Sequence, residues 1–144
     1  MLQIITLHLA RSSEFPTGSL DYGYEIVAPI EAAGHLDSEE WTKLKARCRV
    51  RRFRPEEGER RGMLLHRAGG ASGATWLIHY DGQDRGSEEK GVHLETHRFA
   101  EGEYVSLRDA TGRLNTFKIV LVRPVVTNAG PATAAAPNAF LSTP

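Results

Sequence analysis

The sequence predicts a single small, mainly β domain, an antiparallel β-barrel or curled sheet of about seven strands with one helix. Its 144 residues suit one hydrophobic core better than two. Short runs rich in β-branched and aromatic residues alternate with turn-forming residues along most of the chain. Only one segment has the apolar spacing of a helix, and one helix can plug the end of a small barrel.

The first elements expected are two strands separated by a loop. Leu2–Leu9 is rich in Ile and Leu, which suits a strand buried on both faces. Residues 11–23 contain Ser, Pro, Gly and Asp and are predicted to form the loop. Residues 24–27 are predicted as a short second strand that ends near Pro29, because proline lacks the N–H that a central strand needs.

Residues 38–47 carry the signals of a helix. Asp37 can accept hydrogen bonds from the free N–H groups of the first turn, as an N-cap residue does. Trp41, Leu44 and Cys48 follow at positions i, i+3 and i+7, so they share one face. That face is expected to pack on the core, which makes Cys48 a small buried side chain rather than a reactive thiol.

The segment after the helix, residues 47–54, alternates arginines with other side chains. We favour a strand here, because Val and Phe are strand formers and Pro55 would end it. A helix that continues to Phe53 is the alternative. Residues 56–61 are then expected to form a charged turn.

The middle of the chain predicts a hairpin followed by a loop and a further strand. Strands over residues 63–67 and 75–80 flank a connector made of small residues, which is typical of a hairpin. Residues 81–91 are polar and are expected to form a loop. Residues 92–99 are expected to form a strand.

The globular domain is expected to end at Pro124. A clear hairpin precedes this point, because the turn sequence Asp-Ala-Thr-Gly separates two strand-like segments, residues 103–108 and 114–123. Residues 125–144 are mostly Ala, Thr, Pro and Asn, which bury too little surface to offset the entropy of ordering. We therefore predict one domain over residues 1–124, followed by a disordered tail.

Charge and cysteine content exclude several classes of protein. Lys+Arg and Asp+Glu number 18 each, and a net charge of zero argues against a strongly basic nucleic-acid binder. The charge is unevenly distributed, however, because residues 1–40 are acidic and residues 41–70 are basic. Cys48 is the only cysteine, which rules out an intramolecular disulfide and a zinc site built from cysteines.

The chain is expected to be soluble and cytoplasmic. Its first residues lack the basic stretch of a signal peptide, and Arg11 soon interrupts the apolar run. No stretch approaches the ~20 apolar residues that cross a bilayer. We therefore predict no membrane partner.

The first candidate site is the basic edge, defined here as the arginines of residues 47–54. Its members are Arg47, Arg49, Arg51, Arg52 and Arg54. On a strand, alternate members project from one face about 7 Å apart. A planar guanidinium suits phosphate and carboxylate, so this face is a candidate for binding a nucleic-acid backbone or another polyanion. The alternative is that the arginines pair with acidic residues such as Glu39, Glu40 or residues 21–31.

The second candidate site is a histidine cluster, which would hold a metal ion. Its members are His79, His93, Glu95 and His97. If residues 92–99 form a strand, His93, Glu95 and His97 share one face, and such residues are ligands of mononuclear iron or zinc. Residues i and i+4 of a strand lie about 13 Å apart, so a shared ion requires a broken or bulged strand. The alternative is a polar strand surface that faces solvent.

No motif in the sequence specifies a reaction, so three functions stay open. The one we prefer is a small non-catalytic binding or adaptor domain of bacterial type, without a cofactor, that works through a protein partner. The second is a polyanion or nucleic-acid-backbone binder that uses the basic edge. The third is a small metal-dependent enzyme that uses the histidine cluster. No catalytic residue is predicted.

Overall fold

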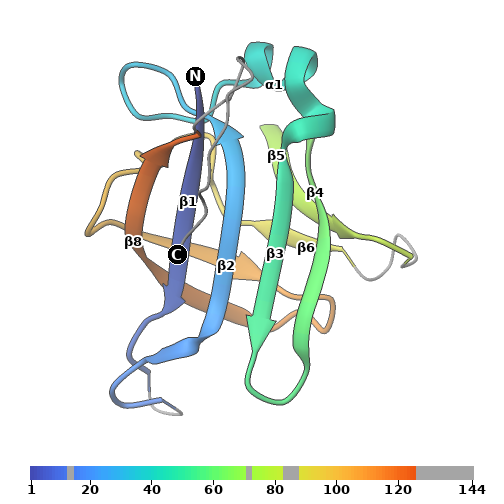
Figure 1. Cartoon of the computed structure of the whole chain (residues 1–144). Coiled ribbons are helices and arrows are strands. Elements are labelled where there is room, and N and C mark those ends of the chain that lie inside the picture. Colours follow the sequence, from blue (N-terminus) through green and yellow to red (C-terminus); the bar gives the residue numbers. More distant parts are fainter. Residues whose placement is uncertain (13–14, 71–72, 83–87, 126–144) are drawn as a thin grey trace, which may run out of the picture.

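The protein folds as a closed antiparallel barrel (Figure 1). The computed structural model describes residues 1–12, 15–70, 73–82 and 88–125. In this part of the chain eight strands pair in sequence order, and the last strand pairs with the first. The predicted class, a small β-barrel with one helix, is therefore confirmed. The strands are β1 (Leu2–Leu9), β2 (Ser19–Pro29), β3 (Arg49–Arg54), β4 (Gly58–Gly70), β5 (Gly73–Tyr80), β6 (Glu89–Gly91), β7 (Tyr104–Arg108) and β8 (Leu114–Pro124).

The α-helix of the described chain lies across one end of the barrel (Figure 1). α1 (Ser38–Leu44) connects β2 to β3 and continues into a short 3₁₀ turn, η1 (Lys45–Arg47). Asp37 is its N-cap, because its carboxylate accepts hydrogen bonds from the backbone N–H groups of Glu39 and Glu40, both 3.1 Å long. The predicted helix is confirmed. No helix among the described residues is long and apolar enough to cross a membrane.

β3 begins two residues later than predicted, at Arg49, because Arg47 belongs to the 3₁₀ turn. The strand pairs with both β2 and β4, so the alternative of a helix that continues to Phe53 is wrong. The charged turn predicted over residues 56–61 is shorter than expected, because β4 already begins at Gly58. Pairing along β3 extends the ladder into this polar sequence.

β2 begins at Ser19, so the loop predicted over residues 11–23 is wrong in its second half. The composition is turn-like, but the segment pairs with β1, and Leu9 lies opposite Ser19 after a register shift. Gly23 is required in this strand, because a Cβ there would lie 1.9 Å from the carbonyl oxygen of Leu7. Pairing with a buried strand outweighs local composition here.

The strand predicted over residues 92–99 is wrong. Residues 92–96 form bends and turns, in which the N–H of Thr96 donates to the carbonyl oxygen of His93, and His93 has a positive φ of 54°. The strand in this region is β6, which lies within the polar loop predicted over residues 81–91. It has three residues and pairs with β5 and β7.

Both predicted hairpins are present. β4 pairs with β5, and β7 pairs with β8, each over the predicted segments. β8 also pairs with β1, which closes the barrel. Val125, the last described residue, donates its N–H to the carbonyl oxygen of Leu2. The rest of the predicted tail lies outside the described residues.

The interior of the barrel differs between its two ends. Near α1 it is filled by apolar side chains, and the indole of Trp41 packs at 6.0 Å from that of Trp76. The Trp41 Nε1 donates a 2.8 Å hydrogen bond to the carbonyl oxygen of Leu64. Toward the other end, the inward side chains of β2, β3, β5 and β6 become polar. The apolar set near α1 comprises Ala28, Leu36, Trp41, Cys48, Val50, Leu64 and Trp76.

Candidate functional site

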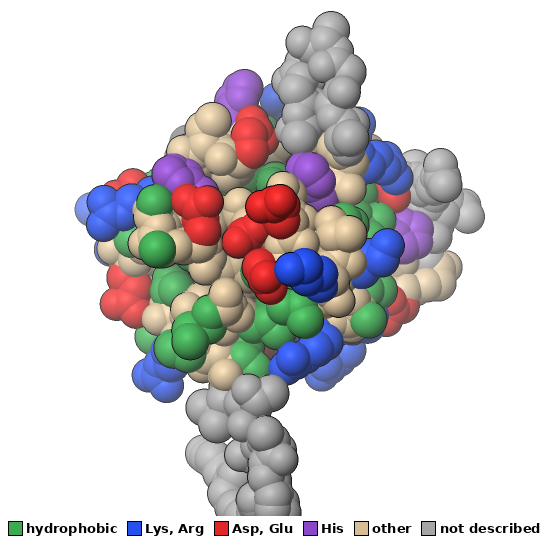
Figure 2. Space-filling model, turned by 90° about the horizontal axis from the view of Figure 1, so that it is seen from above, with side chains coloured by type: hydrophobic (Ala, Val, Ile, Leu, Met, Phe, Trp, Pro, Cys, Tyr) green, Lys and Arg blue, Asp and Glu red, His purple; other side chains and the backbone are tan. Residues whose placement is uncertain are grey.

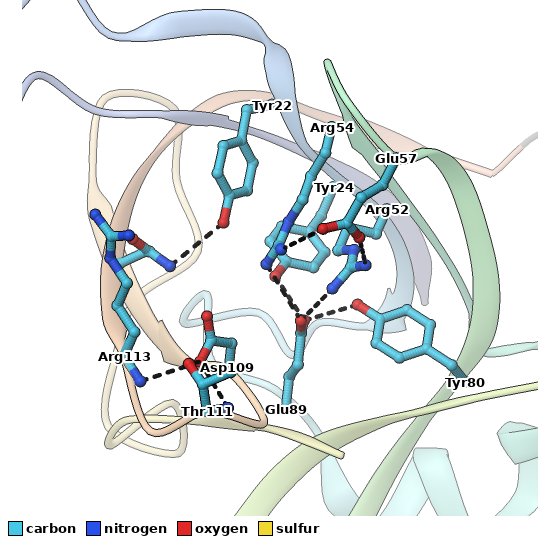
Figure 3. Close-up of polar contacts among 11 residues, drawn as sticks. Tyr22, Tyr24, Arg52, Arg54, Glu57, Tyr80, Glu89, Asp109, Thr111 and Arg113 are labelled. Atoms are coloured by element: carbon cyan, nitrogen blue, oxygen red, sulfur yellow. Dashed lines mark hydrogen bonds and ion pairs between the residues drawn. The ribbon is translucent and has the colours of Figure 1, made fainter. Parts of the chain in front are cut away.

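A buried carboxylate, that of Glu89, is the centre of the polar end of the barrel (Figure 3). Glu89 lies at the start of β6 and is 1% exposed. Its Oε1 accepts hydrogen bonds from the hydroxyls of Tyr24 (2.6 Å) and Tyr80 (2.7 Å), and its Oε2 accepts one from Arg52 Nη1. Arg54 Nη2 lies 3.6 Å from the same Oε2. Side chains from β2, β3 and β5 therefore contact the carboxylate that β6 contributes.

Strand alternation explains why these side chains meet. On β3 the residues Val50, Arg52 and Arg54 turn into the barrel, while the intervening residues face outward. Tyr24 on β2 lies directly opposite Arg52, and Tyr80 on β5 faces the same interior. The distribution of arginines over two faces of one strand thus creates an inner pair and an outer pair.

The inner charges are costly to bury and depend on each other. Arg52 and Glu89 are both buried, and removal of one partner of such a pair usually costs about 3–5 kcal/mol. Apolar residues of similar size often fill such a space with equal or greater stability. The buried pair is therefore not an efficient source of stability.

Both tyrosine hydroxyls stay protonated as hydrogen-bond donors. Burial, and then the negative charge of Glu89, raises the pKa of Tyr24 well above its ordinary value. The same two causes raise the pKa of Tyr80. Burial acts to lower the pKa of Arg52, but Tyr80 and Glu89 outweigh it, so the pKa is raised and the guanidinium stays charged.

A second carboxylate reaches the two inner arginines from the surface. Glu57 lies in the turn between β3 and β4, and its side chain is 39% exposed. It accepts a 2.7 Å hydrogen bond from Arg52 Nη2 and a 3.1 Å hydrogen bond from Arg54 Nη1. Figure 3 shows its carboxylate lying across both guanidinium groups.

A cavity of about 280 Å³ adjoins this cluster. The turns between β3 and β4 and between β7 and β8 border it, and both lie at the end of the barrel opposite α1 (Figure 1). The rings of Phe15 and Tyr22 meet edge to face in its wall, 6.4 Å apart. Asn115 donates its amide to the hydroxyl of Tyr22. Residues that line the cavity include Phe15, Tyr22, Arg54, Glu57, Asp109 and Asn115.

Arg54 lies in the wall of this cavity and reaches from there to Glu89. Its Nε and Nη2 are buried and form no hydrogen bond with any described group, although Nη2 keeps its 3.6 Å ion pair with Glu89. The guanidinium stacks over the ring of Tyr22, 4.8 Å from its centre. This stacking holds the guanidinium at the cavity wall.

Asp109 contributes a negative charge at the other side of the cavity. Partial burial acts to raise its pKa, but hydrogen bonds from the Thr111 hydroxyl and from the backbone N–H groups of Thr111 and Arg113 lower it. The carboxylate is therefore ionised at neutral pH. The cavity is bordered by charges of both signs.

The arginines of the basic edge do not form one surface. Arg47 lies in the 3₁₀ turn, so the expectation that it shares a strand face with Arg49 and Arg51 is wrong. Arg49 pairs with Asp81 at 2.7 Å. Arg51 pairs with two carboxylates, those of Glu25 (3.2 Å) and Glu59 (2.8 Å). Arg52 and Arg54 turn inward and join the cluster around Glu89.

The predicted acidic partners are present in part. Glu25, which pairs with Arg51, belongs to the predicted residues 21–31. Glu40 instead pairs with Lys43 on its own helix, 3.6 Å away. Figure 2 shows acidic and basic side chains lying next to one another on the face seen from above. Many of the opposite charges of this neutral chain thus lie next to one another.

The histidine cluster does not assemble. His93 lies in the segment of bends and turns after β6 and His97 directly follows that segment, and His93 Nδ1 lies 3.9 Å from Glu95. His79 is on β5 and contacts the buried Glu88 at 3.2 Å. Over the described ranges, no group of three His, Cys, Asp or Glu side chains is placed to hold a metal ion.

Sequence reasoning missed the residues that matter most at this site. It placed Arg52 and Arg54 in the basic edge, although alternation with Val50 would have turned both toward the core. It placed Glu89 in a polar loop, because a three-residue strand shows no pattern. No protein-family model, curated protein or solved structure matches this chain.

Proposed function

We propose that the protein is a non-catalytic binding protein, which holds a small organic molecule in the mouth of its barrel opposite α1. The observation that carries this proposal is a cavity of about 280 Å³ whose wall holds the guanidinium of Arg54, stacked on Tyr22, beside the buried charge cluster. Ligand pockets combine apolar surface with polar groups that are held in place. Here Phe15 and Tyr22 supply apolar surface, and Arg54, Asp109 and Arg113 are charged groups of the lining.

A binding role agrees better than catalysis with the state of Glu89. Its Oε1 already accepts from Tyr24 and Tyr80, and its Oε2 accepts from Arg52. A general base needs a free oxygen within reach of the proton that it removes. Glu89 instead fixes the inner arginines, which is the task of a supporting residue in a preorganised binding site.

The other two functions have weaker support. A polyanion at the outer face of β3 would compete with Asp81, Glu25 and Glu59 for Arg49 and Arg51. A metal-dependent enzyme would need ligands that converge, and no group of three does so among the described residues. Among the described residues, the cavity supports a small ligand more directly than any surface feature supports an adaptor role through a protein partner.

The test is an NMR titration of the full chain labelled with ¹⁵N, using benzamide, benzoate and cyclohexanol as probes. We expect at least one probe to shift the backbone amides around Tyr22, Arg54 and Asn115. Asn115→Phe should abolish the shift, because the added ring occupies the cavity. Thr116→Phe, on the exposed face of the same strand, is the matched control and should leave binding intact.

Two results would contradict the proposal. One is that none of the three probes shifts these amides at millimolar concentration. The other is that Asn115→Phe, folded by its amide spectrum, binds the probe as well as the native chain does.

A further inference from the structure

We infer that the ligand of the barrel mouth carries a carboxylate, and that this group takes the place which Glu57 occupies on Arg52 and Arg54. The inference rests on the proposed function and names the chemical class of its ligand. It assigns Glu57 a role as a built-in competitor.

The buried charges call for one more negative group. Arg52 and Arg54 face a single buried carboxylate, that of Glu89, so the fully inner set carries one excess positive charge. Glu57 supplies the balancing charge from the surface. A buried charge without a partner is strongly unfavourable, so this position selects an anion.

The donors at this position have the geometry of a carboxylate site. Arg52 Nη2 and Arg54 Nη1 both donate to Glu57, one to each of its oxygens. Charge-assisted hydrogen bonds of this kind are about twice as strong as neutral ones. A ligand carboxylate in the same place receives the same two bonds.

Glu57 is held only by its carboxylate. Its side chain is 39% exposed, whereas that of Arg52 is 5% exposed. The following residue, Gly58, has a φ of 69°, and no atom lies within 4 Å of where its Cβ would be. The turn therefore has room around it, and a ligand carboxylate that supplies the balancing charge keeps both arginines paired when Glu57 moves away. Glu57 can leave for solvent, which the inner arginines cannot do.

The lining sets the rest of the ligand. Phe15 and Tyr22 offer aromatic edges and faces to an apolar body next to the carboxylate. Asp109, which is ionised, lines the cavity together with Glu56 and Arg113, and the two carboxylates outnumber this guanidinium, so a second negative charge on the ligand is disfavoured. A small monocarboxylate with an apolar or aromatic body fits both features, and a phosphate dianion does not.

The experiment compares benzoate with its neutral isostere benzamide and with inorganic phosphate, by NMR titration of the full chain. The native chain should bind benzoate roughly tenfold tighter than benzamide, because only benzoate gains charge-assisted bonds to both arginines. Phosphate should bind more weakly than benzoate. Glu57→Ala should tighten benzoate binding roughly tenfold, because it removes the competitor, and should leave benzamide affinity unchanged.

Glu59→Ala is the matched control. It removes the same charge two residues away, but Glu59 pairs with Arg51 on the outer face. It should change benzoate affinity less than twofold. A gain in affinity on Glu57→Ala cannot arise from partial unfolding, so this variant is informative even if it lowers stability.

The possible results separate the inference from the function on which it rests. Equal binding of benzoate and benzamide, or tighter binding of phosphate, would overturn the carboxylate class and leave small-molecule binding standing. Unchanged benzoate affinity in Glu57→Ala, or an equal gain in Glu59→Ala, would overturn the role of Glu57. No binding of any probe to either the native chain or Glu57→Ala would overturn both proposals.

Discussion

The two ends of the barrel are filled in opposite ways. Near α1 the interior is apolar, and Trp41 packs against Trp76 and bonds to the carbonyl oxygen of Leu64. At the other end the interior holds Arg52 and Glu89, and a cavity adjoins them. The apolar end gains stability from burial, whereas the polar end is stable only while each charge keeps its partner.

This difference separates the part of the barrel that stabilises the fold from the part that holds the proposed binding site. A small barrel has few interior positions, so each one given to a charge is lost to the apolar core. The closed end under α1 supplies the stability that the open end uses. Such a division is typical of proteins whose binding sites are less stable than the scaffold around them.

Breaking the buried ion pair should have the largest effect. Glu89→Leu removes the buried partner of Arg52, which keeps only its bond to the half-exposed Glu57, and also removes the acceptor of Tyr24 and Tyr80. We expect a loss of about 3–5 kcal/mol in the free energy of unfolding, measured by urea denaturation.

The double variant Glu89→Leu/Arg52→Leu sharpens this comparison. It removes both charges, so it should be more stable than Glu89→Leu alone by at least about 2 kcal/mol. If the two substitutions instead add their costs, the charges at the polar end are not coupled as the geometry requires.

A cavity at the apolar end should lower the free energy of unfolding almost as much, and no second substitution is expected to restore it. Trp41→Ala removes the ring contact with Trp76 and the hydrogen bond to Leu64, and leaves a void under α1. We expect a loss of about 3 kcal/mol in urea denaturation. Lys43→Ala, on the exposed side of the same helix, should cost less than about 0.5 kcal/mol. Equal costs for the two variants would mean that Trp41 does not close the core.

Alkaline pH should weaken the polar end in a graded way. Burial and Glu89 raise the pKa of Tyr24 and Tyr80, whereas an unfolded tyrosine loses its proton near pH 10. The stabilisation is therefore complete below about pH 10 and is lost as pH rises toward the folded-state pKa. The expected slope is about 1.4 kcal/mol per pH unit for each tyrosine.

Two measurements check this pH dependence. Urea denaturation between pH 9 and pH 11 gives the slope of the free energy of unfolding against pH. Tyr24→Phe should reduce this slope by about 1.4 kcal/mol per pH unit, the contribution of one tyrosine. Phenolate absorbance should show that Tyr24 and Tyr80 ionise only as the circular dichroism of the barrel is lost. Ionisation of both in the intact barrel would contradict the buried hydrogen bonds to Glu89.

Local sequence signals predicted much of the fold. The helix begins where Asp37 caps it, because a cap acts on N–H groups only two and three residues away. The β7–β8 hairpin forms where its turn sequence predicts, because turn residues also act only on the backbone next to them. The strand expected over residues 92–99 is wrong, because its composition suits a strand but the ladder with β7 ends at Gly91, followed by one backbone hydrogen bond from Val92 to Ser106.

The candidate site could not be predicted in the same way. Its central residue, Glu89, belongs to a three-residue strand in a polar stretch, where no periodicity identifies an inward position. Arg52 and Arg54 share a local pattern with the outward arginines of β3, and only the closed barrel separates the two groups. Glu57 lies in a turn, and its contact with both inner arginines depends on that turn folding over the barrel mouth.

The sequence by itself determined the class of the protein: one small β domain, a capped helix from Asp37, and a neutral chain whose early acids and later bases can pair. Each of these follows from composition or from neighbours a few residues apart. The tertiary structure alone decided that β8 meets β1, and so which side chains share the interior. Four strands bring Tyr24, Arg52, Tyr80 and Glu89 together, because closure fixes the register of every strand and register fixes which face is inside.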